Sequence, residues 1–287
     1  DNPDALGIVL NYPNQNQEIL TKSKVVLTNN ISEIIKPNTP CVGFIGAGNY
    51  ASRTLIPAFK EAGAVLDTLV TSGGISGVHH GNKNQFVTAS TNVEDLWGND
   101  SINTVSIVTR HDAHAQQVID ALNSGKNVFV EKPLALTLDE LDEIDTSYHK
   151  ANKSNTVRLM VGFNRRYAPH VVKMKKLLDS HRSPKSIIMT VNAGAIPSEH
   201  WVQDPLIGGG RIIGEGCHFI DLIRHLVGHK ITNFQATMMG NVPGVEVRED
   251  KASITLSFED GSFGTIHYLA NGGSAFPKER IEVFCDN

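Results

Sequence analysis

A short apolar stretch that breaks into glycines constrains the fold of this chain more than any other segment. The stretch runs from Cys41 to Ala51 and reads CVGFIGAGNYA. In a nucleotide-binding turn between a strand and a helix, the first glycine permits a tight turn and the second lets the backbone approach a pyrophosphate. The third position needs a small residue so that the helix can pack on its strand, and Ala51 meets this need. Gly46, Gly48, Asn49 and Ala51 are therefore candidate cofactor-binding residues.

The composition is that of a globular chain with room for two domains. Its 287 residues are 40% hydrophobic and 20% charged, and the formal net charge at pH 7 is -4. No basic stripe is present to neutralise phosphates, so a nucleic acid is a poor candidate for a partner. No apolar run approaches the ~20 residues that span a membrane, and no signal-peptide pattern opens the chain. The 3 cysteines form neither a disulfide framework nor a metal pair, which favours a reducing cytoplasm.

Residues 41–163 alternate between strand-like and helix-like segments, which predicts a parallel sheet covered by helices. Thr137 followed by Glu140 forms a capping box at the start of one of these helices. The segment 72–84 is too rich in glycine for a confident helix, and its structure stays open. The expected strands are 42–45, 64–70, 104–109, 127–130 and 157–161, and the expected helices are 50–62, 113–124 and 138–150.

Residues 164–287 differ in character and predict a second domain of α+β type. Several strands follow one another closely, which favours an antiparallel sheet, and Asp260-Gly261 marks a hairpin turn between two alternating runs. The expected strands are 186–193, 234–240, 252–258, 265–270 and 280–284; helices are expected over 170–179 and 212–227, the latter with an apolar stripe of Ile213, Cys217, Ile220 and Ile223.

The two ends of the chain indicate a piece of a longer protein. Residues 1–40 carry polar and proline-rich punctuation and predict a lead-in or linker. The chain starts at Asp1 without a methionine and stops at Asn287, just after a strand-like run, so we expect truncation at the C-terminal end. The expected domains are a lead-in over 1–40, a dinucleotide-binding domain over 41–163 and a substrate and oligomerisation domain over 164–287.

The segment after the second strand bears on the choice of dinucleotide. An acidic residue at this position grips the adenine-side ribose of NAD in many dinucleotide-binding sheets. This chain has Thr71-Ser72-Gly73-Gly74 instead, with no acid and no nearby arginine, and Asp67 falls too early in the run to replace the acid. Ser72 is the candidate contact, and the choice between NAD and NADP stays open.

Polar residues follow two further strands of the expected sheet. The letters TRHDAH run from Thr109 to His114, and EKP follows the strand 127–130. Carboxyl ends of parallel strands line the ligand crevice, so these side chains are candidates by position. His111 and His114 either contact the cofactor or begin a helix with solvated side chains. HDAH has the spacing of a zinc site but lacks a third ligand, so no metal is predicted. The cofactor-binding candidates here are Thr109, His114, Glu131 and Lys132.

The helix expected over 212–227 follows three consecutive glycines and carries His218 near its start. A histidine on such a helix is more often a buried, hydrogen-bonded residue than a catalyst, and Asp221 lies one turn away to hold it. The glycine-rich approach favours a functional interpretation, because it lets a ligand pack closely against the first turn. His218 is therefore a candidate catalytic residue.

These segments together resemble the Gfo/Idh/MocA family of nicotinamide-dependent oxidoreductases. The resemblance rests on GFIGAGNYA, VFVEKPLALTLDEL, VGFNRRYAP and GGGRIIGEGCHFIDL, which follow in this order. TRHDAHA, NAGAIPSEHWVQDP and IHYLANGGSAFPKER look most like the subgroup of bi-domain oxidoreductases. In that subgroup the unit follows a zinc-alcohol-dehydrogenase-like half, often in bacterial polysaccharide pathways. The implied fold is α/β: a Rossmann doubly wound parallel sheet, followed by an α+β domain with a mostly antiparallel open sheet.

The resemblance also implies roles for individual residues. The glycine turn would hold the dinucleotide phosphates, Glu131 and Lys132 would lie beside the nicotinamide, and the Lys132–Pro133 bond would be cis. Lys132 and His218 would be the catalytic residues, with His218 exchanging a proton with a substrate hydroxyl. Weaker candidates for substrate contacts are Asn164, Arg166, Trp201 and Glu215.

One position departs from the family pattern. The family's usual aspartate, four residues before His218, is Gly214 in this chain, and a carboxylate follows at Glu215. On a helix this shift rotates the acid by about 100°. Either the local backbone compensates, or Glu215 lies outside the active site.

These observations predict an NAD(P)-dependent oxidoreductase that transfers a hydride between nicotinamide and a carbinol carbon of a sugar or nucleotide sugar. A neutral His218, with an ordinary pKa of about 6.5, would take the hydroxyl proton, and Lys132 would stabilise the alkoxide. The alternative is a non-catalytic, cofactor-holding scaffold half of a larger protein, and a third possibility is an imine or enone reductase on the same fold. By family analogy, the open sheet of the second domain is expected to support a homo-oligomer, a dimer or tetramer.

Overall fold

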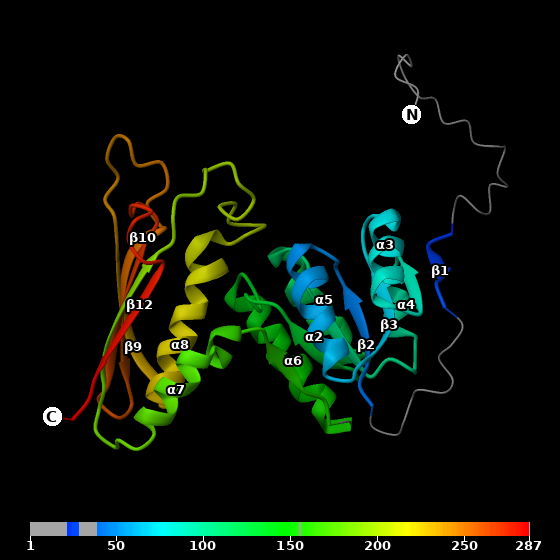
Figure 1. Ribbon diagram of the computed structural model, residues 1–287, viewed down its shortest axis with the longest axis horizontal. Helices are drawn as coiled ribbons and strands as arrows, with labels where there is room; N and C mark the ends of the chain where they lie inside the picture. Colours follow the sequence, from blue (N-terminus) through cyan, green and yellow to red (C-terminus); the bar gives the residue numbers. More distant parts are fainter. Residues whose placement is uncertain (1–21, 29–38, 155, 287) are drawn as a thin grey trace, which may run out of the picture. The chain divides into compact units, whose positions relative to one another are not determined.

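The computed structural model describes residues 22–28, 39–154 and 156–286 (Figure 1). The chain divides into two compact units, Asp1–Ile102 and Asn103–Asn287. Their boundary falls within the stretch 41–163, and the domain limits expected from the sequence stay a prediction. Among the described residues, none of the helices combines the length and the apolar character needed to cross a membrane.

The first unit holds strands in the order β1-β4-β3-β2. Three of them run parallel, β2 (Cys41–Ile45), β3 (Val65–Val70) and β4 (Thr88–Ser90), whereas β1 (Lys24–Val26) pairs antiparallel with β4. The helices are η1 (Ala51–Leu55), which is π-helical and continues as α2 (Ile56–Glu61), then α3 (Gly74–Asn84) and α4 (Glu94–Trp97). The short β4 and α4 were not expected from the sequence.

Strand β2 is buried along its whole length, which explains why its residues form a continuous apolar run. The Phe44 ring meets the edges of Phe59 and Phe86 at centroid distances of 5.3 and 5.9 Å. On the other side, a Cβ at Gly43 would stand 2.5 Å from the Leu96 side chain. Helix α4 therefore packs directly on the strand backbone, and the strand end that carries the glycine turn is held on both faces.

The glycine-rich segment whose structure the sequence left open forms helix α3. Its glycines make room for close packing. A Cβ at Gly77 would stand 2.7 Å from the Thr71 hydroxyl, and one at Gly81 would stand 2.4 Å from Leu27. The propensity cost of glycine is thus offset by packing that no larger residue permits.

The second unit begins with three parallel strands in the order β5-β6-β7, which are β5 (Thr104–Ile107), β6 (Asn127–Val130) and β7 (Leu159–Val161). The helices between them are the short 3-10 helix η2 (His111–Ala113), α5 (His114–Asn123) and α6 (Leu138–Ser154). The predicted capping box is confirmed, because Glu140 N donates to the Thr137 hydroxyl at 3.2 Å and Thr137 N donates to the Glu140 carboxylate at 3.1 Å.

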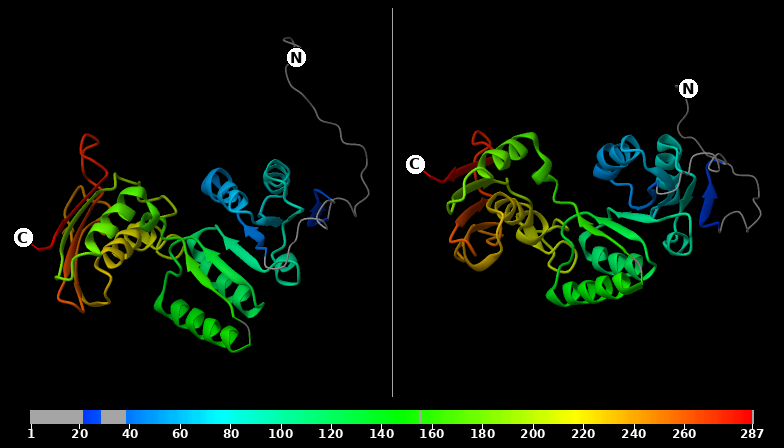
Figure 2. Two further views of the ribbon diagram at one scale, coloured as in Figure 1. Left: turned by 60° about the horizontal axis from the view of Figure 1, so that its bottom comes forward. Right: turned by 90° about the horizontal axis from the view of Figure 1, so that it is seen from below.

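A five-stranded sheet follows, in the order β12-β8-β11-β10-β9. Its strands are β8 (Ser186–Asn192), β9 (Ile231–Met238), β10 (Lys251–Phe258), β11 (Phe263–Leu269) and β12 (Glu279–Phe284). All neighbours are antiparallel except β8 and β11, which are parallel, and the predicted hairpin joins β10 to β11. Helices α7 (Pro169–Leu178) and α8 (Cys217–Val227) cover one face of this sheet (Figure 2).

The apolar stripe expected over 212–227 is confirmed only in part, at Ile220 and Ile223, which pack on the sheet. Ile213 is 39% exposed, and Cys217 and Ile220 are only half-buried. The residues fully packed against the sheet are Phe219, Leu222, Ile223 and Leu226. For Ile213 the reason is that residues Ile212–Gly216 form a π-helical turn, η4, which changes the phase between the residues before and after it.

Candidate active site

The glycine turn of the first unit has the geometry that a dinucleotide phosphate needs. Gly46 adopts a positive φ of 101°, and a Cβ at Gly48 would meet nothing within 4 Å, so the backbone there is open to approach. Ala51 is fully buried at the start of η1, whereas Asn49 is exposed. The residues present therefore fit a dinucleotide.

The segment after β3 offers no carboxylate to a ribose. Ser72 is exposed, and the Thr71 hydroxyl donates to the Gly73 carbonyl at 2.8 Å. Asp67 is buried, and its carboxylate accepts hydrogen bonds from Thr68 at 2.6 Å and from Asn99 at 3.0 Å. Asp67 thus has a structural place inside the first unit.

In the second unit, the EKP turn directly follows β6, and its Lys132–Pro133 peptide bond is cis, as the resemblance implied. Burial raises the pKa of Glu131 even though the Lys132 charge opposes this rise. Its Oε1 has no hydrogen-bond partner among the described residues. A Cβ at Gly162 would stand 2.6 Å from that oxygen, so glycine is required there. An orphaned, buried carboxyl oxygen beside a lysine fits a site that a polar ligand group completes.

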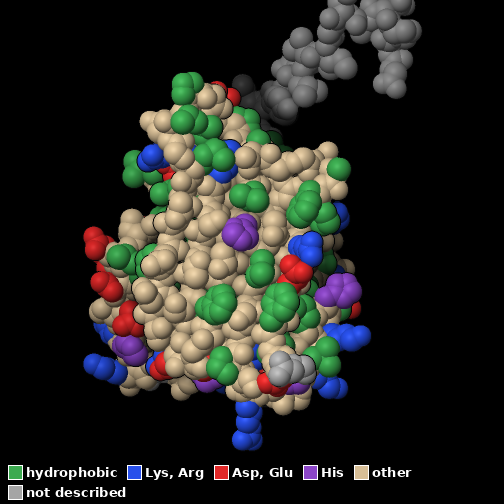
Figure 3. All heavy atoms as spheres, turned by 90° about the vertical axis from the view of Figure 1, so that its left-hand side faces the viewer, with side chains coloured by type: hydrophobic (Ala, Val, Ile, Leu, Met, Phe, Trp, Pro, Cys, Tyr) green, Lys and Arg blue, Asp and Glu red, His purple; other side chains and the backbone are tan. Residues whose placement is uncertain are grey.

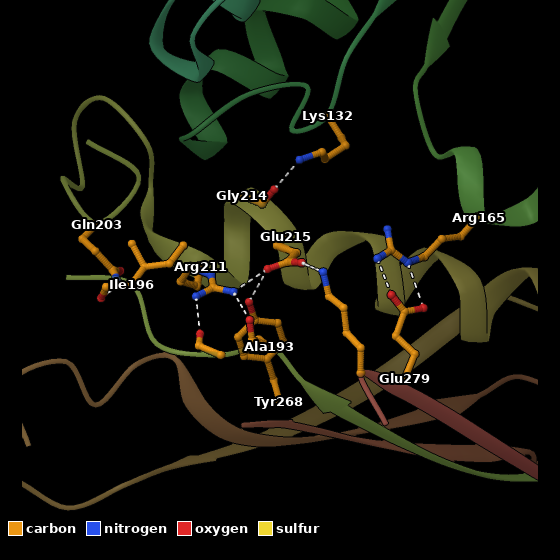
Figure 4. Close-up of polar contacts among 12 residues, drawn as sticks. Lys132, Arg165, Ala193, Ile196, Gln203, Arg211, Gly214, Glu215, Tyr268 and Glu279 are labelled. Atoms are coloured by element: carbon orange, nitrogen blue, oxygen red, sulfur yellow. Dashed lines mark hydrogen bonds and ion pairs between the residues drawn. The ribbon is translucent and has the colours of Figure 1, made fainter. Parts of the chain in front are cut away.

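Lys132 links the EKP turn to the start of the helix that carries His218. Its Nζ donates a hydrogen bond to the Gly214 carbonyl at 2.8 Å (Figure 4). His218 is 5% exposed, and its Nδ1 has no partner among the described residues. Burial first, and then the charges of Lys132 and Arg165, lower the pKa of His218 to about 3. His218 is therefore a neutral base at every pH near neutrality.

Asp221 does not hold His218, contrary to the simplest structural expectation. Its carboxylate forms an ion pair with Arg166, in which Arg166 Nε lies 2.6 Å from Oδ2. The Arg166 side chain therefore binds helix α8. Asn164 is exposed in the 3-10 helix η3 (Asn164–Tyr167). A different arginine of η3, Arg165, donates to Glu279 at 2.6 Å and stacks at 4.6 Å over the Phe219 ring.

Both histidines at the start of α5 are buried, so the interpretation with solvated side chains is wrong. His114 Nδ1 lies 2.7 Å from the Pro133 carbonyl and its Nε2 lies 3.3 Å from the Thr109 carbonyl, which fastens the EKP turn to the end of β5. The Thr109 hydroxyl donates to Gln117 at 2.9 Å.

His111 lies against the segment that leads into η4. Its Nδ1 is 2.8 Å from the Gly208 carbonyl, and its ring meets the Trp201 ring edge-on at 5.0 Å. Burial is the main cause that lowers the pKa of His111 to about 4, and the Lys132 charge contributes. Trp201 is half-buried, with the Arg110 guanidinium 5.7 Å above its ring. Sequence reasoning identified His111 without deciding its role, because only the folded chain brings residues 201–214 beside it.

Glu215 faces the five-stranded sheet. Its Oε2 accepts hydrogen bonds from Arg211 at 2.7 Å and from the Tyr268 hydroxyl at 2.6 Å (Figure 4). Arg211 also donates to the carbonyls of Ala193 and Gly194. Burial and the neighbouring Glu215 raise the pKa of Tyr268. The carboxylate therefore joins η4 to the ends of β8 and β11, and a role in substrate contact stays a prediction.

The comparisons with known proteins agree with this architecture. Residues 41–163 match the family described as "Oxidoreductase family, NAD-binding Rossmann fold", and residues 171–287 match the GFO/IDH/MocA C-terminal domain. The fold is thus an NAD-binding Rossmann domain followed by an α+β domain. The chain belongs to the GFO/IDH/MocA family of oxidoreductases.

Individual relatives share about a third or less of their residues with this chain. The uncharacterized oxidoreductase YrbE of Bacillus subtilis is 28% identical over 68% of this chain and 56% of its own length. An NAD(+)-dependent scyllo-inositol 2-dehydrogenase of the same organism is 32% identical over 58% of this chain and 48% of its own length. Among solved structures, a levoglucosan dehydrogenase in complex with NADH and levoglucosan has a TM-score of 0.72 at 22% identity, covering 86% of this chain and 71% of that one. The chain thus spans about half the length of these two curated relatives.

The two buried histidines predict a loss of stability in mild acid. Each histidine has a lower pKa in the folded chain than in the unfolded chain, where it is about 6.5. The folded state is therefore fully stable above about pH 6.5 and loses stability as the pH falls toward about 4 for His111 and about 3 for His218. Within this window, each histidine adds about 1.4 kcal/mol per pH unit to the slope of the unfolding free energy. Urea denaturation at several pH values should show a smaller slope for His218→Asn. The exposed His149→Asn serves as control, and an unchanged slope in His218→Asn would contradict the assignment.

The Glu215 network predicts a large difference between two neighbouring substitutions. Glu215→Ala leaves the Arg211 side chain, 3% exposed, with its charge unpaired, and should lower the unfolding free energy by about 3–5 kcal/mol. Lys278 also lies near Glu215, but its Nζ is 3.9 Å away and its side chain is 63% exposed, so Lys278→Ala should cost about 0–1 kcal/mol. Chemical denaturation of the two variants measures the difference, and equal losses would argue against a structural Glu215.

Proposed function

We propose that the chain supplies the catalytic and cofactor-binding parts of an NAD(P)-dependent dehydrogenase or reductase that acts on a carbinol carbon of a sugar or nucleotide sugar. The observation that carries this proposal is the convergence of Lys132 and His218. A lysine ammonium held at the Gly214 carbonyl acts on a buried, neutral histidine whose Nδ1 has no partner among the described residues. The nicotinamide, when bound, supplies the hydride-accepting or hydride-donating ring.

The two residues divide the handling of the hydroxyl group. His218 accepts the proton of the reacting hydroxyl as the carbonyl forms, and its neutral state makes its lone pair available. The Lys132 ammonium stabilises the negative charge that develops on the same oxygen. A lowered pKa makes His218 a weak base, so the nearby cation must also increase the acidity of the hydroxyl. The two residues therefore act together. The Lys132 charge weakens His218 as a base and also stabilises the alkoxide.

Each unit carries residues that we predict to bind the cofactor. In the first unit these are Gly46, Gly48, Asn49, Ala51 and Ser72, of which the open backbone at Gly48 is the strongest support. In the second unit they are Thr109, His114, Glu131 and Lys132, where the unpartnered Oε1 of Glu131 provides an acceptor. Ser72 carries no charge that would select for or against the ribose phosphate of NADP. Binding and turnover are therefore measured with both NAD and NADP.

The substrate class follows the relatives. Scyllo-inositol, levoglucosan and a set of nucleotide sugars form the first panel, because dehydrogenases named for the first two compounds are among the similar proteins. A place in polysaccharide biosynthesis, attachment to an N-terminal alcohol-dehydrogenase-like half and a cytoplasmic setting are expectations of the sequence that stay predictions. Cofactor binding without turnover of any panel compound would support the scaffold alternative.

Lys132→Met tests the proposed chemistry. The substitution removes the ammonium but keeps an unbranched side chain, so turnover should fall at least about 100-fold while NADH binding, followed by fluorescence titration, changes little. Lys176→Met, at an exposed position of α7, is the matched control and should keep normal turnover. Normal turnover in Lys132→Met would overturn the assignment.

We further infer that the uncovered face of the five-stranded sheet supports self-association. On this face, toward the viewer in Figure 3, charged side chains lie mostly near the margins. Phe263 and Phe284 flank Ser186 in register and are 48% and 57% exposed, with Ile188 beside them at 40%. Exposed aromatic side chains on a sheet face are typical of contact surfaces.

The double variant Phe263→Lys with Phe284→Lys should shift the chain to monomers in sedimentation velocity, because it places charges in the proposed contact. Phe276→Lys alters a similarly exposed ring, 45% exposed, that lies outside the strands, and should leave the oligomeric state unchanged. A wild-type chain that sediments as a monomer at all concentrations would contradict self-association.

A further inference from the structure

His111 is placed at the same site as Lys132 and is not used by the proposed chemistry. A Cβ at Gly214 would stand 3.0 Å from His111 Cε1, and the Gly214 carbonyl is the group that Lys132 binds. The His111 ring therefore fills the space that any side chain at position 214 would need. The ring and the ammonium thus both contact one glycine.

The hydrogen bond at Nδ1 determines which ring nitrogen can serve a ligand. Nδ1 lies 2.8 Å from the Gly208 carbonyl, which only accepts hydrogen bonds, so Nδ1 carries the proton of the neutral ring. Nε2 then bears a lone pair. Among the described residues, the Gly208 carbonyl at Nδ1 is the only hydrogen-bond partner of this side chain.

The backbone around His111 is fixed on both sides of the contact. Asp112 N donates to the Ile207 carbonyl at 3.2 Å, and Gly208 N and Gly209 N donate to the Asp204 carbonyl at 2.8 and 2.9 Å. A Cβ at Gly208 would stand 2.4 Å from the Val202 backbone, so the turn has no room to shift. His111 is thus a preorganised acceptor.

The other polar groups of the site make an acceptor valuable. Lys132 offers only donors, His218 is assigned to the reacting hydroxyl, and the unpartnered oxygen of Glu131 is assigned to the cofactor. A sugar or polyol carries further hydroxyl groups, each with a proton to donate. The half-buried Trp201 ring beside His111 adds an apolar surface, which suits the carbon face of such a molecule.

We propose that His111 Nε2 accepts a hydrogen bond from a second hydroxyl of the substrate, so that the site selects polyols over simple alcohols. This inference rests on the proposed function, because it assigns a binding role within the same site. His111 is a binding and selecting residue, distinct from the pair that handles the reacting oxygen.

Two substitutions separate the hydrogen bond to the Gly208 carbonyl from the proposed hydrogen bond to the substrate. His111→Asn keeps a donor near the position of Nδ1 for the Gly208 carbonyl and removes the acceptor at Nε2, whereas His111→Gln keeps an acceptor near Nε2. For the panel compound that is turned over, His111→Asn should raise KM about 3- to 10-fold, the effect of one lost hydrogen bond, with kcat little changed. His111→Gln should recover part of this loss. For a deoxy analogue of that compound, which lacks the second hydroxyl, wild type and His111→Asn should have the same KM. An equal loss for polyol and deoxy analogue would overturn the proposal.

A second measurement tests the role of His111 and does not require the chain to turn over a substrate. Long-range 1H–15N NMR of histidine-labelled protein, assigned through His111→Asn, reports which ring nitrogen carries the proton. We expect Nδ1–H at pH 7, and a shift of the Nε2 resonance when glycerol, the smallest polyol, is added, but not with 1-propanol. An Nε2–H ring, or equal responses to glycerol and 1-propanol, overturns the role of His111. The expected NMR result without turnover of any panel compound would instead count against the proposed reaction and leave the acceptor established.

Discussion

The hydrogen bond from the Lys132 ammonium to the Gly214 carbonyl is the interaction on which the site in the second unit depends. It joins the turn after β6 to η4, and so connects the parallel strands β5 to β7 with the helix that packs on the five-stranded sheet. The acceptor is a neutral carbonyl, so the charge of Lys132 is not cancelled at its end. In a partly buried site such a charge acts strongly on its neighbours. It contributes to the lowered pKa values of His111 and His218.

Two groups of the site meet at Gly214. Its carbonyl accepts the hydrogen bond from Lys132, and its lack of a side chain leaves the space that the His111 ring fills. The neighbouring Glu215 points the other way and binds Arg211 and Tyr268. A buried ion pair contributes little net stability by itself, but each partner would be costly if left alone. The Glu215 network therefore positions η4 against the sheet.

Local patterns predicted most elements of the fold. The capping box before α6, the β10–β11 hairpin and the apolar run of β2 each depend on neighbouring residues, and all three are confirmed. The glycine-rich segment of α3 could not be predicted, because its stability comes from close packing against Thr71 and Leu27. The exposure of Ile213 could not be predicted, because it depends on the π-helical turn that precedes α8.

The sequence by itself determined the order of most strands and helices, the glycine turn, and the candidate site residues Lys132, His111 and His218. These depend on residue type and spacing along the chain, which periodicity and turn chemistry reveal. Only the tertiary structure decided that Lys132 meets the Gly214 carbonyl, that Asp221 pairs with Arg166, and that Glu215 faces Tyr268. Each of these contacts joins residues at least 50 positions apart, with distances between 2.6 and 2.8 Å. Such contacts follow from how whole elements pack, and no local rule specifies which distant groups that packing brings together.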